Sequence, residues 1–180
     1  SRCNGRASGG GGLGGCGPNP AVVCVRVKDG RVVGRGWTQP GGRPQGEVMA
    51  LAQAADQARG ATAYVTLEPC AHYGKTPPCA DALTSAGIAR AVVALRDPDP
   101  RTDGGGIAVR RAAGIAVTEG IEQAAAAWDH AGFLSRVRRG RPLVTLKLAT
   151  SFDGRIATGS GESKWITGPA ARRHVHADRA

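Results

Sequence analysis

The sequence has few aromatic residues, no long apolar run and an odd number of cysteines. Aromatic residues are 4% of the 180 positions, which disfavours a protein that stacks nucleic-acid bases on its rings. No apolar run approaches the roughly 20 residues that a membrane-spanning helix needs. Five cysteines without a charged-then-apolar leader argue against a secreted, disulfide-bonded protein. We therefore expect a cytoplasmic globular protein with no membrane segment.

The charge is strongly positive and unevenly placed. The formal net charge is +10 at pH 7, and most of the excess falls in residues 136–180. A basic region attracts nucleic acid or a phosphorylated small molecule. It is equally typical of a solvated surface in an arginine-rich protein, so charge alone does not separate these classes.

Residues 1–17 are rich in glycine and have almost no large apolar side chain. Such a segment cannot offset its ordering entropy, so we predict a disordered arm. From residue 18 onward, apolar runs alternate with segments of helical periodicity, and an Asp-Gly pair indicates a hairpin. This alternation predicts an α/β layer fold with a largely parallel sheet over residues 18–140. The expected strands are 22–27, 32–37, 63–67, 91–95 and 115–118, and the expected helices are 47–58, 79–86, 107–112 and 122–136.

The last forty or so residues do not close a domain of their own. A break rich in arginine precedes an expected strand at 143–148, a glycine-rich loop at 153–161 and one arginine-rich helix. One strand and one helix cannot surround a hydrophobic core. We therefore interpret residues 141–180 as the incomplete start of a second domain.

Three side chains that suit metal chemistry stand at the ends of predicted elements. Glu47 begins the first helix, Cys70 follows a strand, and Cys79 begins a helix after two prolines. Helix starts favour thiolates, because the helix dipole stabilises an anion there. Zinc deaminases combine a His-x-Glu pair with a Pro-Cys pair and a second cysteine, and their glutamate moves protons without binding the metal. Core packing poorly explains two cysteines beside prolines, so the pattern predicts a zinc site.

The two cysteines are separated by eight residues rather than by the usual two, and this insertion points to one family. Residues 18–180 resemble the bifunctional riboflavin-biosynthesis family, in which a pyrimidine deaminase is joined to a pyrimidine reductase. The resemblance implies a three-layer, cytidine-deaminase-like sheet flanked by helices, followed by a truncated dihydrofolate-reductase-like segment. It rests on residues 18–20, 28–37, 47–51, 66–83, 97–100, 132–141 and 143–168.

The resemblance also implies a reaction. The deaminase would hydrolyse one amino group of a diaminohydroxypyrimidine that carries a phosphoribosylamino group, and it would release ammonia. Glu47 would carry the proton, while Cys70 and Cys79 would bind the zinc that activates water. Gln45 stands at the position of the family's histidine, and its neutral amide is a weaker zinc ligand than imidazole.

Three further residues would bind the deaminase substrate. The resemblance implies that Asn19, His72 and Lys75 line the pocket, the last two near the ribose-phosphate. The residues themselves leave simpler roles open. Asn19 lies between two prolines and could form a turn, His72 could cap its own loop, and Lys75 could be a solvated cation.

In the second segment, the resemblance implies contacts with a nicotinamide cofactor and with the reductase substrate. Ala149 and Trp165 would face NADP(H), and Ser163 and Arg179 would face the substrate. NADPH would reduce the ribose to an open ribityl chain. Trp165 could equally be a core residue.

Gln45 keeps three hypotheses of function open. The chain could be an active zinc deaminase, with His72 as an alternative third ligand. It could be a catalytically impaired copy that acts only as a scaffold. The positive charge also suggests a deaminase of nucleic acids, which the long cysteine spacing and scarce aromatic residues disfavour. Assembly into a homo-oligomer is left open.

Overall fold

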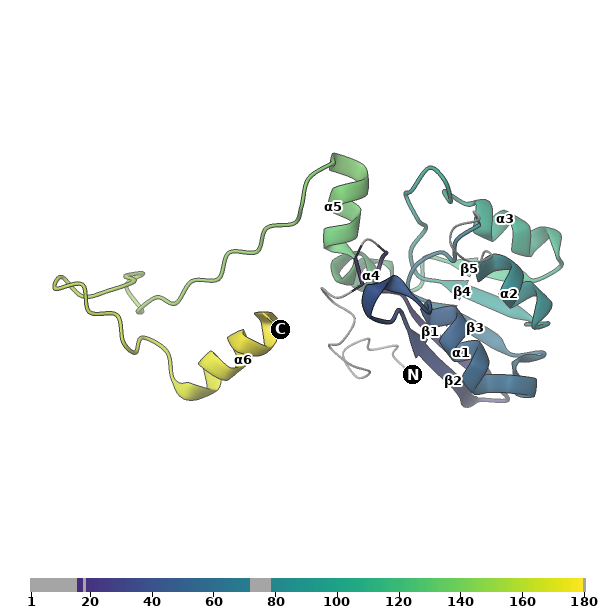
Figure 1. The fold of residues 1–180 in the computed structure, drawn as a ribbon, viewed down its shortest axis with the longest axis horizontal. Coiled ribbons are helices and arrows are strands. Elements are labelled where there is room, and N and C mark those ends of the chain that lie inside the picture. The colour runs from purple at the N-terminus through teal and green to yellow at the C-terminus, as the bar shows by residue number, and fades with distance from the viewer. Residues whose placement is uncertain (1–15, 18, 72–78, 180) are drawn as a thin grey trace. The chain divides into compact units, whose positions relative to one another are not determined.

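The computed structural model describes residues 16–17, 19–71 and 79–179 (Figure 1). Two compact units make up the chain, the first ending at Leu143 and the second beginning at Val144. The predicted arm lies outside the described residues except at its end, where the buried Cys16 thiol contacts the carbonyl of Thr38 at 3.2 Å. The predictions for His72 and Lys75 also lie outside the described residues, as does the side chain of Arg179.

The first unit contains a five-stranded mixed sheet in the order β2-β1-β3-β4-β5 (Figure 1). The β1–β2 and β1–β3 pairs are antiparallel, whereas the β3–β4 and β4–β5 pairs are parallel. The expectation of a largely parallel sheet therefore holds for one half only. Asp29 and Gly30 have positive φ angles of 49° and 73°, which is the geometry of a tight hairpin and makes β1 and β2 antiparallel. The strands are β1 (Val23–Lys28), β2 (Arg31–Trp37), β3 (Thr62–Val65), β4 (Arg90–Val93) and β5 (Ala116–Glu119).

Helices α1 (Gly46–Ala54), α2 (Cys79–Ser85) and α3 (Gly105–Ala112) pack on one face of the sheet. Side chains alternate along a strand, so Cys24 and Val65, which pair across β1 and β3, point to the same face. They pack there with Ala50 of α1 and Ile107 of α3. Leu83 of α2 joins a second cluster on the same face.

Glycines bring α1 close to β2. A Cβ atom at Gly36 would overlap the backbone of α1 at the carbonyl of Gly46 and the amide of Ala50. A Cβ atom at Gly34 would overlap the carbonyl of Ala50. The helix that begins at the site is therefore seated directly on the strand backbone, with the short helices η2 (Pro40–Gly42) and η3 (Ala55–Ala58) before and after it.

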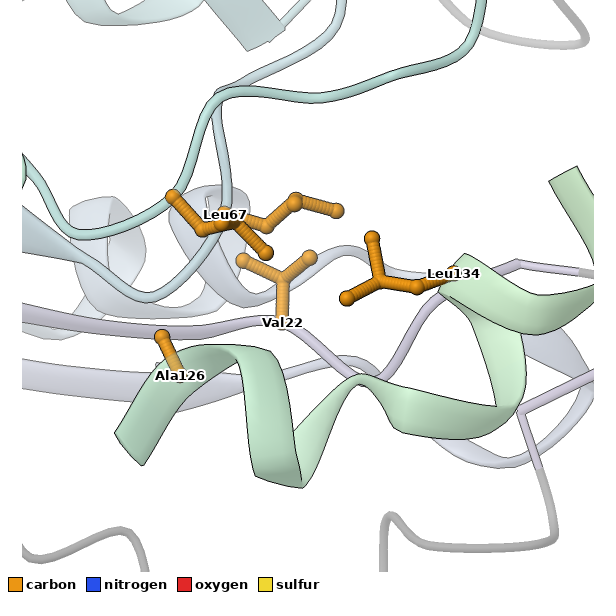
Figure 2. Packing of buried hydrophobic residues seen from close by; sticks show 5 residues of the cluster. Val22, Leu67, Ala126 and Leu134 are labelled. Atoms are coloured by element: carbon orange, nitrogen blue, oxygen red, sulfur yellow. The ribbon is translucent and has the colours of Figure 1, made fainter. Parts of the chain in front are cut away.

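Helices α4 (Gln123–Asp129) and α5 (Ala131–Arg139) provide the third layer and close one end of the sheet. Ala126 and Leu134 pack against Val22 and Leu67 there (Figure 2). The sequence predicted one helix over 122–136, but the helix is interrupted at His130, whose ring nitrogen Nε2 lies 3.2 Å from the Thr66 hydroxyl. The predicted three-layer, cytidine-deaminase-like fold is confirmed.

The second unit contains turns and one helix, α6 (Pro169–Arg179). The strand predicted at residues 143–148 is wrong, because this segment has no strand structure. A strand needs a neighbour to satisfy its backbone N–H and C=O groups, and no described residue pairs with this segment. Among the described residues, no helix is both long and apolar enough to cross a membrane.

Candidate active site

Gln45, Cys70 and Cys79 meet at one point beside the start of α1. The Cys79 thiol lies 2.6 Å from Oε1 of Gln45, and the Cys70 thiol lies 3.8 Å from the same oxygen. The backbone N–H of Cys79 also donates to Sγ of Cys70 at 3.4 Å. These contacts bring together side chains that are up to 34 residues apart in the sequence.

The start of α1 holds Gln45 in place through its backbone. The Gln45 carbonyl accepts hydrogen bonds from Val48 and Met49, both at 3.1 Å. Its side chain makes no capping hydrogen bond, so the amide is directed to the two sulfur atoms. Gly46 is packed tightly, since a Cβ there would lie 2.6 Å from the carbonyl oxygen of Val22.

Glu47 has a buried carboxyl group next to these three side chains. The residue is 3% exposed, and its Oε2 has no hydrogen-bond partner among the described residues. Burial raises the pKa of Glu47 to about 7, although the positive charges of Arg110 and Arg26 act in the opposite direction. A carboxyl group with such a pKa can accept and release a proton near neutral pH.

Two arginines that sequence reasoning missed are buried near Glu47. All three guanidinium nitrogens of Arg26 lack a hydrogen-bond partner among the described residues. Arg110 donates from Nη1 to the carbonyl of Gly106 at 2.7 Å, while its Nε and Nη2 lack partners in the same set. Burial lowers the pKa of both groups. For Arg26, the available signal was its inward position in an apolar strand.

Glu68 is a third residue that the sequence analysis did not single out. Its carboxylate accepts backbone N–H bonds from Asp97 at 3.2 Å, from Gly104 at 3.1 Å and from Ile107 at 3.1 Å. These bonds attach the start of α3 and the loop at Asp97 to the segment that carries Cys70. Glu68 is therefore a positioning residue for the site.

A pocket of about 70 Å³ opens beside the converging side chains. Asn19 lines it and donates from Nδ2 to the carbonyl of Gly42 at 2.8 Å. Of the residues predicted to form the site, the pocket brings together Asn19, Gln45, Glu47 and Cys70. Other lining residues that sequence reasoning did not assign include Arg43, Asp97, Asp99 and Phe133.

The residues expected to bind NADP(H) and the reductase substrate lie in the second unit. Ala149 is half-buried there, and Ser163 is exposed. Trp165 is 70% exposed and therefore is not a core residue of this unit. The Arg172 guanidinium stacks on its ring at 4.2 Å. Their cofactor and substrate roles remain predictions.

Comparison with known proteins shows a close relationship over nearly the whole chain. The chain is 53% identical over 163 residues to the riboflavin biosynthesis protein RibD of Escherichia coli, and this alignment covers 91% of the chain. The same protein of Aquifex aeolicus is 48% identical over 159 residues. The chain belongs to the RibD family. It spans 44% of the length of the E. coli RibD protein and 45% of the A. aeolicus one.

Family profiles and solved RibD structures agree with this relationship. The profile of the cytidine and deoxycytidylate deaminase zinc-binding region matches residues 13–95, and that of the RibD C-terminal domain matches residues 142–180. RibD of Acinetobacter baumannii is 53% identical, with a TM-score of 0.81 over 93% of this chain and 47% of the other. A diaminohydroxyphosphoribosylaminopyrimidine deaminase/5-amino-6-(5-phosphoribosylamino)uracil reductase of Thermotoga maritima is 44% identical, with a TM-score of 0.87 over 94% and 49%.

The RibD relationship implies zinc, and the donor atoms of this chain fit it in number and position. The sulfur atoms of Cys79 and Cys70 lie 2.6 and 3.8 Å from the amide oxygen of Gln45, so the three donor atoms that would hold the metal converge. The described residues contain no group of three or more His, Cys, Asp and Glu side chains that could hold a metal. Among the described donors, the amide oxygen of Gln45 lies beside both sulfur atoms.

Proposed function

We propose that the first unit is a zinc-dependent pyrimidine deaminase of riboflavin biosynthesis. The observation that carries the proposal is the convergence of Gln45, Cys70 and Cys79 beside the buried carboxyl group of Glu47. Membership of the RibD family supports a pyrimidine with a phosphoribosylamino group as the substrate.

In this proposal, Cys70, Cys79 and Gln45 hold the zinc ion. When bound, zinc supplies Lewis-acid activation of a water molecule. Glu47 would accept a proton from the attacking water at its buried carboxyl group and would donate a proton to the departing amino group, and its pKa of about 7 suits both roles. The net change replaces one ring C–NH₂ by C=O and consumes one water for each ammonia released.

The pocket supplies groups that suit the proposed substrate. The carboxylates of Asp97 and Asp99 line it and can accept hydrogen bonds from the amino groups of a diaminopyrimidine. Arg43 lines the same pocket and can pair with a phosphate. Asn19 adds a polar amide, and we retain His72 and Lys75 as proposed ribose-phosphate contacts.

For the second unit, we propose a role as the start of the NADP(H)-dependent reductase part of RibD. Ala149 and Trp165 would then face the cofactor, and Ser163 and Arg179 would face the substrate. The support is the match of residues 142–180 to the RibD C-terminal domain. On the same family basis we propose a cytoplasmic location.

The decisive experiment measures ammonia release from the phosphoribosylamino-diaminohydroxypyrimidine at saturating zinc. Glu47→Gln is expected to lower the rate roughly 10²- to 10⁴-fold, because the amide cannot carry the proton. Glu122→Gln, at an exposed carboxylate, serves as the matched control and keeps the rate of the unmodified chain. An unchanged rate in Glu47→Gln would remove that residue from the mechanism.

Gln45 favours a second candidate, a catalytically impaired chain that keeps the fold and acts only as a scaffold. A neutral amide binds zinc less strongly than an imidazole does. This candidate predicts a folded chain that releases no ammonia at any zinc concentration. Ammonia release by the zinc-saturated chain would exclude it.

A further inference from the structure

We propose that Gln45 binds zinc through its amide oxygen and makes the metal site of this chain weak, so that zinc occupancy follows the free zinc concentration. This inference rests on the proposed function and deepens it. In this inference, Gln45 controls which fraction of the deaminase molecules holds zinc.

The first support is the position of the amide oxygen. Oε1 of Gln45 contacts both sulfur atoms, at 2.6 Å for Cys79 and 3.8 Å for Cys70. If Oε1 of Gln45 moved by less than about 1 Å, both of its distances to sulfur could reach the roughly 3.5 Å expected between two ligands of one zinc ion. The backbone of Gln45 is fixed by two hydrogen bonds within α1, so the side chain alone has to adjust.

The second support is the chemistry of the donor set. Zinc binds thiolate, imidazole and carboxylate ligands in proteins, and an amide oxygen is neutral and only a weak donor among them. Two thiolates therefore supply most of the binding. A site with one weak ligand releases its metal more readily than a site with three strong ones.

The third support is the electrostatic environment. Arg110 is buried and interacts with the charges of Cys79 and Glu47, and Arg26 is buried and interacts with the charge of Glu47. Neither guanidinium group is paired with a carboxylate in the described ion pairs. The positive charge of Arg110, which interacts with the donor Cys79, opposes the approach of a dication, because desolvated charges interact strongly.

Glu47 and His72 are the competing third ligands. The Glu47 carboxylate is buried beside the site, but a metal-bound Glu47 could not serve as the proton carrier. His72 lies outside the described residues. The contact geometry favours Gln45, since its oxygen touches both sulfur atoms.

The test measures the zinc dissociation constant of the metal-stripped full chain, under reducing conditions, by competition with a chromophoric chelator. We expect one zinc per chain. Gln45→His should bind zinc roughly 10- to 100-fold more tightly, comparable to other changes that tune a zinc ligand. Gln45→Ala should bind it more weakly than the unmodified chain. Glu47→Gln and His72→Ala should weaken binding less than Gln45→Ala does, and Cys79→Ser should abolish binding while circular dichroism verifies folding.

The proposal is overturned if Gln45→His binds no more tightly than the unmodified chain, or if Gln45→Ala binds equally well. It is also overturned if the affinity is lost in Glu47→Gln or His72→Ala instead. None of these measurements depends on turnover. If zinc-saturated Gln45→His releases no ammonia, the proposed function fails while the order of zinc affinities still stands.

Discussion

Arg26 is a charged side chain on a sheet face that otherwise packs apolar residues against helices. It is fully buried, and none of its guanidinium nitrogens has a hydrogen-bond partner among the described residues. A buried charge without hydrogen bonds costs several kcal/mol. The lowered pKa of the group has burial as its first cause. The buried charge of Arg26 near the site therefore lowers the free energy of unfolding of the chain.

Replacing this arginine should stabilise the chain. Arg26→Leu is expected to raise the free energy of unfolding by about 1–3 kcal/mol, because an apolar side chain removes the buried charge. Arg31→Leu, at an exposed position one strand away, is the control and should change little. Thermal unfolding followed by circular dichroism measures both variants. A lower melting temperature for Arg26→Leu would show that the charge has a compensating partner.

His130 makes stability depend on pH. Burial lowers its pKa, against the opposing charge of Asp129, so the folded chain keeps the ring neutral. The unfolded chain has an ordinary histidine with a pKa near 6.5 and binds a proton below that pH. Stability should therefore fall as the pH drops below about 6.5, by at most about 1.4 kcal/mol per pH unit for one proton.

His130→Gln is expected to flatten this part of the pH profile. The measurement is the urea midpoint of the variant and of the unmodified chain between pH 5 and 8. His176→Gln changes an exposed histidine of α6 and serves as control. The account of His130 is wrong if its variant keeps the full slope.

At the level of elements, the contact of α1 with β2 positions Gln45 and Glu47. The sequence predicted both elements from hydrophobic periodicity and the Asp-Gly turn, and their bounds differ from the observed ones by a few residues. It could not predict the close approach at Gly34 and Gly36, because nothing local distinguishes a packing glycine from a flexible one. The contact between Gln45 and the cysteines depends on this approach.

Gly36→Ala should disturb this contact. The added methyl group would overlap backbone atoms of α1, and such overpacking costs about 1–3 kcal/mol. Gly17→Ala, where a Cβ has open space, should be neutral. Denaturant unfolding compares the two variants. Equal stabilities would show that α1 does not rest on the strand backbone as described.

At the level of the whole molecule, local sequence patterns predicted the helices and strands of the first unit. The contacts between residues far apart in the sequence could not be predicted. The elements of the first unit and the cysteines at element boundaries follow from turns, periodicity and prolines. The antiparallel β1–β3 pairing involves strands far apart in the sequence. The role of Glu68 depends on three backbone groups that only the fold brings together. The predicted strand at 143–148 fails because no described residue pairs with it.

X-ray absorption spectroscopy of the zinc-loaded full chain tests the central claim most directly. The account predicts two sulfur ligands at about 2.3 Å, from Cys70 and Cys79, and lighter oxygen or nitrogen ligands near 2.0 Å. Cys79→Ser should leave no zinc bound with two sulfur ligands. A spectrum of the unmodified chain without sulfur ligands would contradict the assignment of this site.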